Sequence, residues 1–166
     1  MITLVDINPE MLTVGQKRAV ERGIPAETLT FTLDNAETLE NIPSESVDCY
    51  TIAFGIRNVT HISAALKAAH RVLKPGGRFS CLEFSQVSVP VLKQIYDFYS
   101  FNVIPTIGEV VANDRASYQY LVESIRKFPP QEEFRDMIKE AGFKVIGRGY
   151  EDLTGGIAAI HTGWKL

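Results

Sequence analysis

Short apolar runs alternate with longer segments of helical spacing along most of the chain, and this alternation constrains the fold more than any other feature of the sequence. Strands that alternate with helices form a parallel sheet with helices packed on its faces. We therefore predict an α/β fold with a doubly wound sheet. The predicted strands are residues 2–5, 29–33, 47–54, 78–84, 144–150 and 156–162, and the predicted helices are residues 9–23, 62–73, 118–128 and 131–141.

Local signals mark the ends of several elements. Asn8-Pro9-Glu10 is a helix start, because Asn caps the first turn, Pro suits the first helical position and Glu complements the helix dipole. Lys74-Pro75-Gly76-Gly77 stops the second helix, and Gly142 caps the last one. Only a short polar link separates the last two strands, which predicts an antiparallel hairpin at one edge of the sheet.

The composition predicts one packed domain. Of the 166 residues, 45% are hydrophobic and 22% are charged, and the formal net charge is −3. Phosphate backbones are bound by clustered Lys and Arg, so we expect no nucleic-acid partner. Cys49 and Cys81 lie inside apolar runs and are expected to be buried, reduced thiols. No apolar run is long enough to span a bilayer.

Acidic residues follow two of the predicted strands, where ligands of such sheets bind. Asp6 can accept hydrogen bonds from a ribose diol, or it can form a local turn into the helix capped by Asn8. Asp34, with Asn35 beside it, can accept from an adenine amino group, or it can belong to a solvated turn or a helix cap. For Asp6 or Asp34 taken alone, the ligand-binding and the local structural interpretation both stay open. Together the two acids fit one adenosine lying across two strand tips.

Arg57 follows the third predicted strand, within residues 54–58. Its fixed positive charge at the mouth of the crevice can stabilise an oxyanion on a substrate, or it can pair with a surface carboxylate. Glu83 lies in an apolar strand, where a lone buried carboxylate is costly, so we expect Arg57 to be its partner. The pair can serve catalysis or be purely structural.

The remaining candidates carry weaker signals. His61, His70 and His161 show no spacing typical of metal ligands, so no metal site is expected and each is interpreted as a packing or surface residue. An aromatic-rich stretch at residues 89–111 is either a core helix with its connection, or an apolar wall or lid for a lipid-like substrate, or a membrane-facing surface.

A set of motifs gives the chain a resemblance to a known family. They are VDINPEML at 5–12, DNAE at 34–37, FGIRN at 54–58, HRVLKPGGRF at 70–79, LEFS at 82–85, SYQYLVESIRKFP at 117–129 and AGF at 141–143. KPGG is common to many methyltransferases, whereas FGIRN with LEFS and SYQYLVESI is much more specific. On these motifs the chain resembles the UbiE-type C-methyltransferases of ubiquinone biosynthesis, and most closely their eukaryotic, mitochondrial members.

The resemblance implies a class I S-adenosylmethionine (SAM)-dependent methyltransferase fold, which is Rossmann-like, and C-methylation of a polyprenyl benzoquinol with S-adenosyl-L-methionine as cofactor. It implies that Asp6 binds the ribose and that Asp34 and Asn35 bind the adenine side. Arg57 becomes the catalytic contact to the quinol oxygen, with a water or Glu83 as the base, so Arg57 and Glu83 are the candidate catalytic residues. It also implies a peripheral protein on the matrix side of the mitochondrial inner membrane, in a complex of quinone-biosynthesis proteins, and leaves a homo-oligomer open.

The chain departs from the family pattern at its beginning. The family has a strand and a glycine-rich loop before the VDIN motif, whereas here Met1 comes just before Ile2. We therefore expect an incomplete SAM-dependent methyltransferase domain over residues 1–166, with a substrate or lid insertion around residues 87–128. The first strand and the glycine loop are expected to be missing. That strand is the central one, between the strands ending at Asp6 and Phe54.

Two other functions stay open. A catalytically inactive, truncated form could act as a scaffold in the quinone-synthesis complex, and a SAM-binding assay would distinguish it from the enzyme. A nicotinamide-dependent dehydrogenase would also use an acid like Asp6, but it fits the FGIRN and LEFS motifs poorly.

Overall fold

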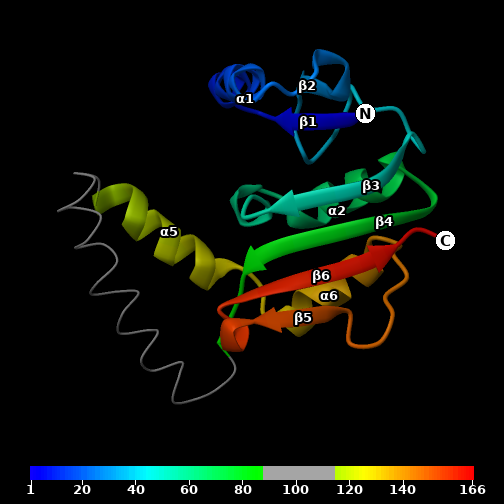
Figure 1. Cartoon of the computed structure of the whole chain (residues 1–166). Coiled ribbons are helices and arrows are strands. Elements are labelled where there is room, and N and C mark those ends of the chain that lie inside the picture. The colour runs from blue at the N-terminus through cyan, green and yellow to red at the C-terminus, as the bar shows by residue number, and fades with distance from the viewer. Residues whose placement is uncertain (88–114) are drawn as a thin grey trace.

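A computed structural model describes residues 1–87 and 115–166 of the chain (Figure 1). Its strands are β1 (Ile2–Asp6), β2 (Leu29–Leu33), β3 (Val47–Ala53), β4 (Leu73–Phe84), β5 (Tyr150–Leu153) and β6 (Ala158–Trp164). Its helices are α1 (Pro9–Glu21), α2 (Ile62–Val72), α5 (Arg115–Lys127) and α6 (Gln131–Glu140), with short 3-10 helices at Ala26–Thr28, Ile56–Asn58 and Thr154–Gly156.

The strands form two sheets. β1 pairs in parallel with β2, and the second sheet has the order β3-β4-β6-β5. β3 and β4 are parallel, whereas β6 is antiparallel to both β4 and β5. The predicted α/β architecture and its antiparallel C-terminal hairpin are therefore confirmed.

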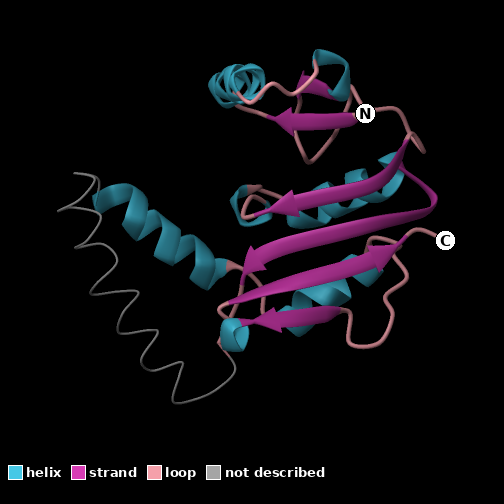
Figure 2. Cartoon of the chain, viewed as in Figure 1, coloured by secondary structure: helices cyan, strands magenta, loops and turns pink. Residues whose placement is uncertain are grey.

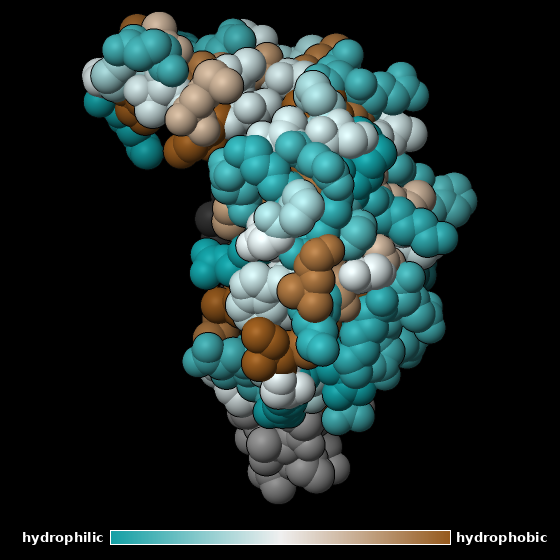
Figure 3. Space-filling view, turned by 90° about the vertical axis from the view of Figure 1, so that its right-hand side faces the viewer, coloured by the Kyte–Doolittle hydropathy of each residue, from teal (hydrophilic) through white to brown (hydrophobic). Residues whose placement is uncertain are grey.

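In the view of Figures 1 and 2, β1 lies next to β3, with a gap between the two strands. Each of these strands is paired on one side only within the described part of the chain, and both point the same way. The sequence led us to expect an absent strand at this position, between the strands that end at Asp6 and Phe54. From the side, the α1–β1–β2 part overhangs the rest of the molecule, with apolar atoms along its underside (Figure 3).

The main core lies on one face of the larger sheet. Leu66 and Ala69 of α2 pack with Phe79 of β4 and with Phe134 and Ile138 of α6, and all five are almost completely buried. The hydrophobic effect therefore fixes α2 and α6 against this sheet. By contrast, α1 contributes no buried residue. No helix in the described ranges is long and apolar enough to cross a membrane.

The prediction of a strand at residues 144–150 was wrong. Only Lys144 bridges Trp164, and β5 begins at Tyr150. Gly147 and Gly149 have φ values of 59° and 80°, and this left-handed backbone cannot continue an extended strand.

β4 begins earlier than the predicted residue 78. Leu73 already pairs with Val47, and the register shifts before Cys49 pairs with Arg78. The Lys74-Pro75-Gly76-Gly77 segment therefore forms an irregularity inside a strand rather than a simple loop.

The two cysteines differ in their surroundings. Cys81 is buried, as predicted, and burial raises the pKa of its thiol. The prediction for Cys49 was wrong: it is exposed, because side chains alternate between the faces of a strand and Cys49 lies on the face opposite Tyr50 and Ile52, which pack against the main core. Both are free thiols. The aromatic stretch at 89–111, and with it most of the expected insertion around 87–128, lies outside the described residues.

Candidate functional site

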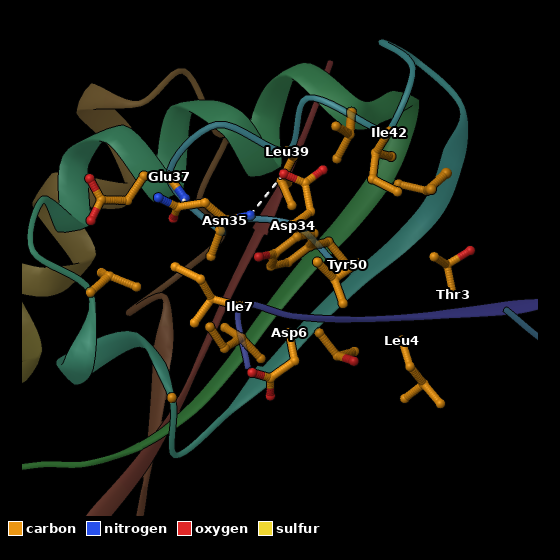
Figure 4. A pocket seen from close by; sticks show the side chains of 18 of the residues that line it. Thr3, Leu4, Asp6, Ile7, Asp34, Asn35, Glu37, Leu39, Ile42 and Tyr50 are labelled. Atoms are coloured by element: carbon orange, nitrogen blue, oxygen red, sulfur yellow. Dashed lines mark hydrogen bonds between the residues drawn. The ribbon is translucent and has the colours of Figure 1, made fainter. Parts of the chain in front are cut away.

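A cavity of about 1120 Å³ lies between β1 and β3, at the carboxyl ends of the strands and along their open edges (Figure 4). The opening runs along the whole length of the two strands, where the sequence led us to expect an absent strand, so only its carboxyl end is the candidate ligand site. The residues of its lining that matter below are Asp6, Ile7, Asp34, Asn35, Glu37, Tyr50, Gly55, Asn58 and Thr60. Burial raises the pKa of Tyr50 to about 12, so its hydroxyl stays protonated at neutral pH.

Asp6 ends β1 at this cavity. Its Oδ1 accepts a hydrogen bond of 2.8 Å from the backbone N–H of Asn8, and Asn8 in turn caps α1 by accepting from the N–H of Glu10 at 2.8 Å. The local turn considered for Asp6 therefore exists. A carboxylate has about four acceptor positions, so this turn leaves capacity for a ribose diol.

Asp34 is occupied more fully by its own loop. It accepts from the backbone N–H groups of Asn35, Glu40 and Asn41 at 2.8, 3.2 and 2.7 Å. Figure 4 shows Asp34 turned toward this loop, with Asp6 on the other side of the β1 ribbon. The structure thus brings Asp6, Asp34 and Asn35 to one cavity. Most of the acceptor positions of the Asp34 carboxylate are used to stabilise its own loop.

Arg57 and Glu83 meet beside the cavity rather than in its wall. Nη1 of Arg57 lies 2.9 Å from Oε1 of Glu83, and the two side chains are 10% and 1% exposed. The backbone N–H of Arg57 also donates to Oε2 of Glu83 at 3.3 Å. The expected pairing is confirmed, and Gly55 and Asn58, on either side of Arg57, connect it to the cavity.

Further contacts fix the orientation of Arg57. Nη1 donates to the carbonyl of Phe54 at 2.5 Å, and Nε donates to the hydroxyl of Ser124 at 3.4 Å. The guanidinium carbon lies 5.4 Å from the centre of the Phe84 ring. Phe54 itself has a φ of 52°, a left-handed conformation that turns the chain sharply out of β3. These contacts hold the cation close to the strand ends.

Sequence reasoning missed the contribution of α5. Ser124 contacts Arg57, and the Tyr120 hydroxyl lies 3.3 Å from Oδ1 of Asn58. Both residues are inside the SYQYLVESI motif, so the motif itself was the available signal.

The roles of Glu37 and Arg71 were also not predicted from the sequence. The Glu37 carboxylate accepts from the backbone N–H groups of Thr60 and His61, at 2.9 and 3.1 Å. Arg71 donates to the carbonyls of Thr38, Leu39 and Ile42 and to the Ser44 hydroxyl, at 2.8–3.2 Å. Glu37 lies in the motif DNAE and Arg71 in the motif HRVLKPGGRF. Neither motif indicates which backbone groups these side chains bind.

The histidines lie away from the Arg57–Glu83 pair. His61 precedes α2, His70 packs edge-on against Phe143, and His161 is buried between Phe134 and Tyr150. Packing or surface positions were expected for all three.

The sequence matches the ubiE/COQ5 methyltransferase family over residues 1–165. The chain belongs to this family. It is 61% identical over 166 residues to the mitochondrial 2-methoxy-6-polyprenyl-1,4-benzoquinol methylase of Rattus norvegicus, and 60% identical to the protein of that name from Oryza sativa. It is 56% identical over 165 residues to the ubiquinone/menaquinone biosynthesis C-methyltransferase UbiE of Brucella canis.

These alignments cover 99–100% of the chain but 50%, 55% and 60% of the three relatives. The chain therefore spans about half the length of the curated relatives it matches.

Solved structures confirm the class I methyltransferase fold. A SAM-dependent methyltransferase of Thermotoga maritima matches with a TM-score of 0.67 and 19% identity, covering 100% of this chain and 73% of that one. A SAM-dependent methyltransferase of Aquifex aeolicus matches with a TM-score of 0.64 and 13% identity, covering 99% and 68%. At these identities the likeness concerns the fold alone.

Proposed function

We propose that the protein carrying this chain uses SAM to methylate a ring carbon of a polyprenyl benzoquinol in ubiquinone biosynthesis. The observation that carries the proposal is the joining of Asp6, Asp34 and Asn35 in one cavity beside the Arg57–Glu83 pair, in a member of this family. Relatives named as mitochondrial support a mitochondrial location. We further propose that the protein binds peripherally to the matrix side of the inner membrane, together with other quinone-biosynthesis proteins.

The residues at the cavity fit the adenosine half of SAM. Asp6 offers unused carboxylate acceptors for the two ribose hydroxyls, and Asn35 lies in a loop whose shape Asp34 fixes. Asp34 has one acceptor position left after its three loop contacts, which suits a single adenine amino hydrogen. SAM, when bound, supplies a methyl group on a positively charged sulfur.

Arg57 supplies the electrostatics of the proposed reaction. A ring carbon between oxygen substituents becomes a stronger nucleophile when a neighbouring hydroxyl loses its proton, and a fixed guanidinium lowers the pKa of such a hydroxyl. Glu83 holds the guanidinium in place, since its carboxylate is only 1% exposed and bonded to Arg57. The hydroxyl proton therefore passes to water in this mechanism, and the methylated ring carbon then loses its own proton as the oxygen regains one. Apposition of the ring and the methyl group supplies much of the remaining rate.

Methyl transfer tests the proposal directly. The full-length protein, given SAM and a prenylated benzoquinol, should yield the C-methylated ring and S-adenosylhomocysteine, while Asp6→Ala should weaken cofactor binding in calorimetry. Binding of SAM without methylation of any quinol would contradict the proposed substrate class.

The open gap between β1 and β3 favours a second candidate for the 166-residue chain on its own. In that form it would keep partner surfaces but bind SAM weakly, and would act as a scaffold in the quinone-synthesis complex. A micromolar dissociation constant for SAM, measured on the isolated 166 residues, would exclude this second candidate.

A further inference from the structure

Glu37 joins two loops that both reach the cavity. It lies in the loop that follows β2, three residues after Asp34, and its side chain is 17% exposed. Oε1 accepts from the backbone N–H groups of Thr60 at 2.9 Å and His61 at 3.1 Å, and Oε2 lies 2.9 Å from Nδ1 of His61. In Figure 4, Glu37 points away from Asp34 toward the beginning of α2.

This carboxylate lies at the N-terminus of α2 although it comes from another part of the chain. His61 is the N-cap residue of α2, and its own side chain makes no capping hydrogen bond. The first N–H groups of a helix need acceptors, and a negative charge there also complements the helix dipole. Glu37, 24 residues away, accepts from the N–H of the N-cap residue His61 and from that of Thr60 before it, and its negative charge lies at this end of the helix. These hydrogen bonds lower the pKa of Glu37, with that of the His61 side chain as the largest cause, so Glu37 is charged at neutral pH.

The loop that carries Glu37 is fixed at its other end as well. Arg71, in the last turn of α2, donates to the carbonyls of Thr38, Leu39 and Ile42. One end of α2 therefore holds Glu37 while the other holds the rest of the loop. The position of Asn35 is therefore fixed by the contacts of Glu37 and Arg71 and by the hydrogen bonds within the loop itself.

The second loop held by Glu37 is the one that carries Arg57. Thr60 and His61 lie between the 3-10 helix Ile56–Asn58 and α2, so a shift of these backbone amides moves the end of that segment. Arg57 itself is anchored to Glu83 on β4. Glu37 is thus a direct link between the loop of Asn35 and the loop of Arg57.

We propose that Glu37 is a positioning residue, which sets the cofactor-side loop and the Arg57 loop relative to each other. The proposal deepens the proposed methyl transfer and rests on it. Transfer requires the ring and the methyl donor to be aligned closely, and a small displacement of one side lowers the rate by about 100-fold. Loss of Glu37 should therefore affect cofactor affinity and turnover together.

The test compares Glu37→Ala and Glu37→Gln with Glu40→Gln in the full-length protein. Glu40 is an exposed acid of the same loop, which makes it the matched control. We expect Glu37→Ala to weaken S-adenosylhomocysteine binding about 10-fold and to lower kcat about 10- to 100-fold. Glu37→Gln should recover part of both losses, because an amide oxygen still accepts from the two N–H groups but without charge assistance. Glu40→Gln should stay within about twofold of wild type.

Hydrogen exchange gives a readout independent of catalysis. The amides of Thr60 and His61 should exchange faster in Glu37→Ala than in Glu40→Gln, with the core of β4 unchanged. A Glu37→Ala protein with a lower melting temperature, but normal affinity, kcat and loop exchange in its folded fraction, would overturn the proposal. So would a loss of affinity with kcat unchanged, since the two loops would then not be linked. Absence of methyl transfer in the wild type would instead count against the proposed function, and the exchange data would still decide the role of Glu37.

Discussion

Arg57 and Glu83 form a buried ion pair, with 2.9 Å between Nη1 and Oε1, that ties the loop after β3 to the end of β4. The pair is almost sealed from water, since its side chains are 10% and 1% exposed. Removing one member of such a pair leaves the other charge buried and uncompensated, which is strongly destabilising. Any test of Arg57 in catalysis must therefore separate the loss of its charge from the loss of the fold.

Arg57→Ala in the full-length enzyme should reduce kcat by about two to three orders of magnitude, the range for losing one oxyanion donor. SAM affinity should change little, because the cofactor contacts come from Asp6, Asp34 and Asn35. The pH dependence of the rate should move upward, since the substrate hydroxyl is no longer acidified. Arg57→Lys keeps the charge but loses the planar fork, so its kcat should lie between those of the wild type and Arg57→Ala.

A double variant separates the catalytic role of Arg57 from its role in the stability of the fold. Arg57→Met should lower the free energy of unfolding by about 3–5 kcal/mol, and adding Glu83→Leu should restore most of it, because no unpaired charge remains. Activity should stay low in the double variant. If the stabilised double variant turned over normally, Arg57 would be structural and the catalytic group would lie elsewhere.

Much of this architecture could be predicted because it is local or follows from burial. The starts of β1, β2, β3 and α1 follow from apolar periodicity and from the Asn8-Pro9-Glu10 cap, and the structure agrees with them. The Arg57–Glu83 pair also could be predicted, since a carboxylate in an apolar strand demands a cation.

The remainder depends on contacts that the sequence does not display. Glu37 and Arg71 act on backbone groups more than 20 residues away, and nothing in their own neighbourhood indicates those partners. Cys49 was misplaced because its apolar neighbours do not show which face of β3 the core covers. The 144–150 error came from reading apolar residues around Gly147 and Gly149 as a strand, although their backbone is left-handed.

His161 should make stability depend on pH. It is 1% exposed, its Nε2 lies 3.0 Å from the carbonyl oxygen of Gln131, and burial lowers its pKa from the usual 6.5. Below pH 6.5 the unfolded chain then binds more protons than the folded one, so the free energy of unfolding should fall as pH drops from about 6.5. Chemical denaturation at pH 8, 6.5 and 5 measures this loss. His161→Gln should reduce the dependence in this window, where His70, whose pKa burial also lowers, contributes the same sign. An unchanged slope would assign the dependence to other groups.

Gly77 should tolerate no side chain. A Cβ built at this position would lie 2.8 Å from the carbonyl oxygen of Lys74 and 2.9 Å from Cδ2 of the buried Leu73. Gly77→Ala should therefore lower the free energy of unfolding by about 1–3 kcal/mol in denaturant titrations. Gly23→Ala is the comparison, because a Cβ there meets nothing within 4 Å and its cost, about 1 kcal/mol, comes from φ alone. An equal loss of unfolding free energy in the two variants would show that the backbone around Gly77 shifts to accommodate the added methyl group.

The 166-residue chain should associate with itself through the open edges of β1 and β3. Unpaired strand edges are templates for pairing with another chain, and Ile2 and Leu4 of β1 are 57% and 40% exposed. A charge on such an edge opposes pairing, so Leu4→Lys should shift the chain toward monomer in sedimentation velocity over a concentration series. Val20→Lys makes the same change of charge on α1, where Val20 is 78% exposed and belongs to a helix rather than to a strand edge. It should leave the association in place. A chain that stays monomeric at every concentration, or that Val20→Lys disperses as well as Leu4→Lys, would show that the strand edges do not drive association.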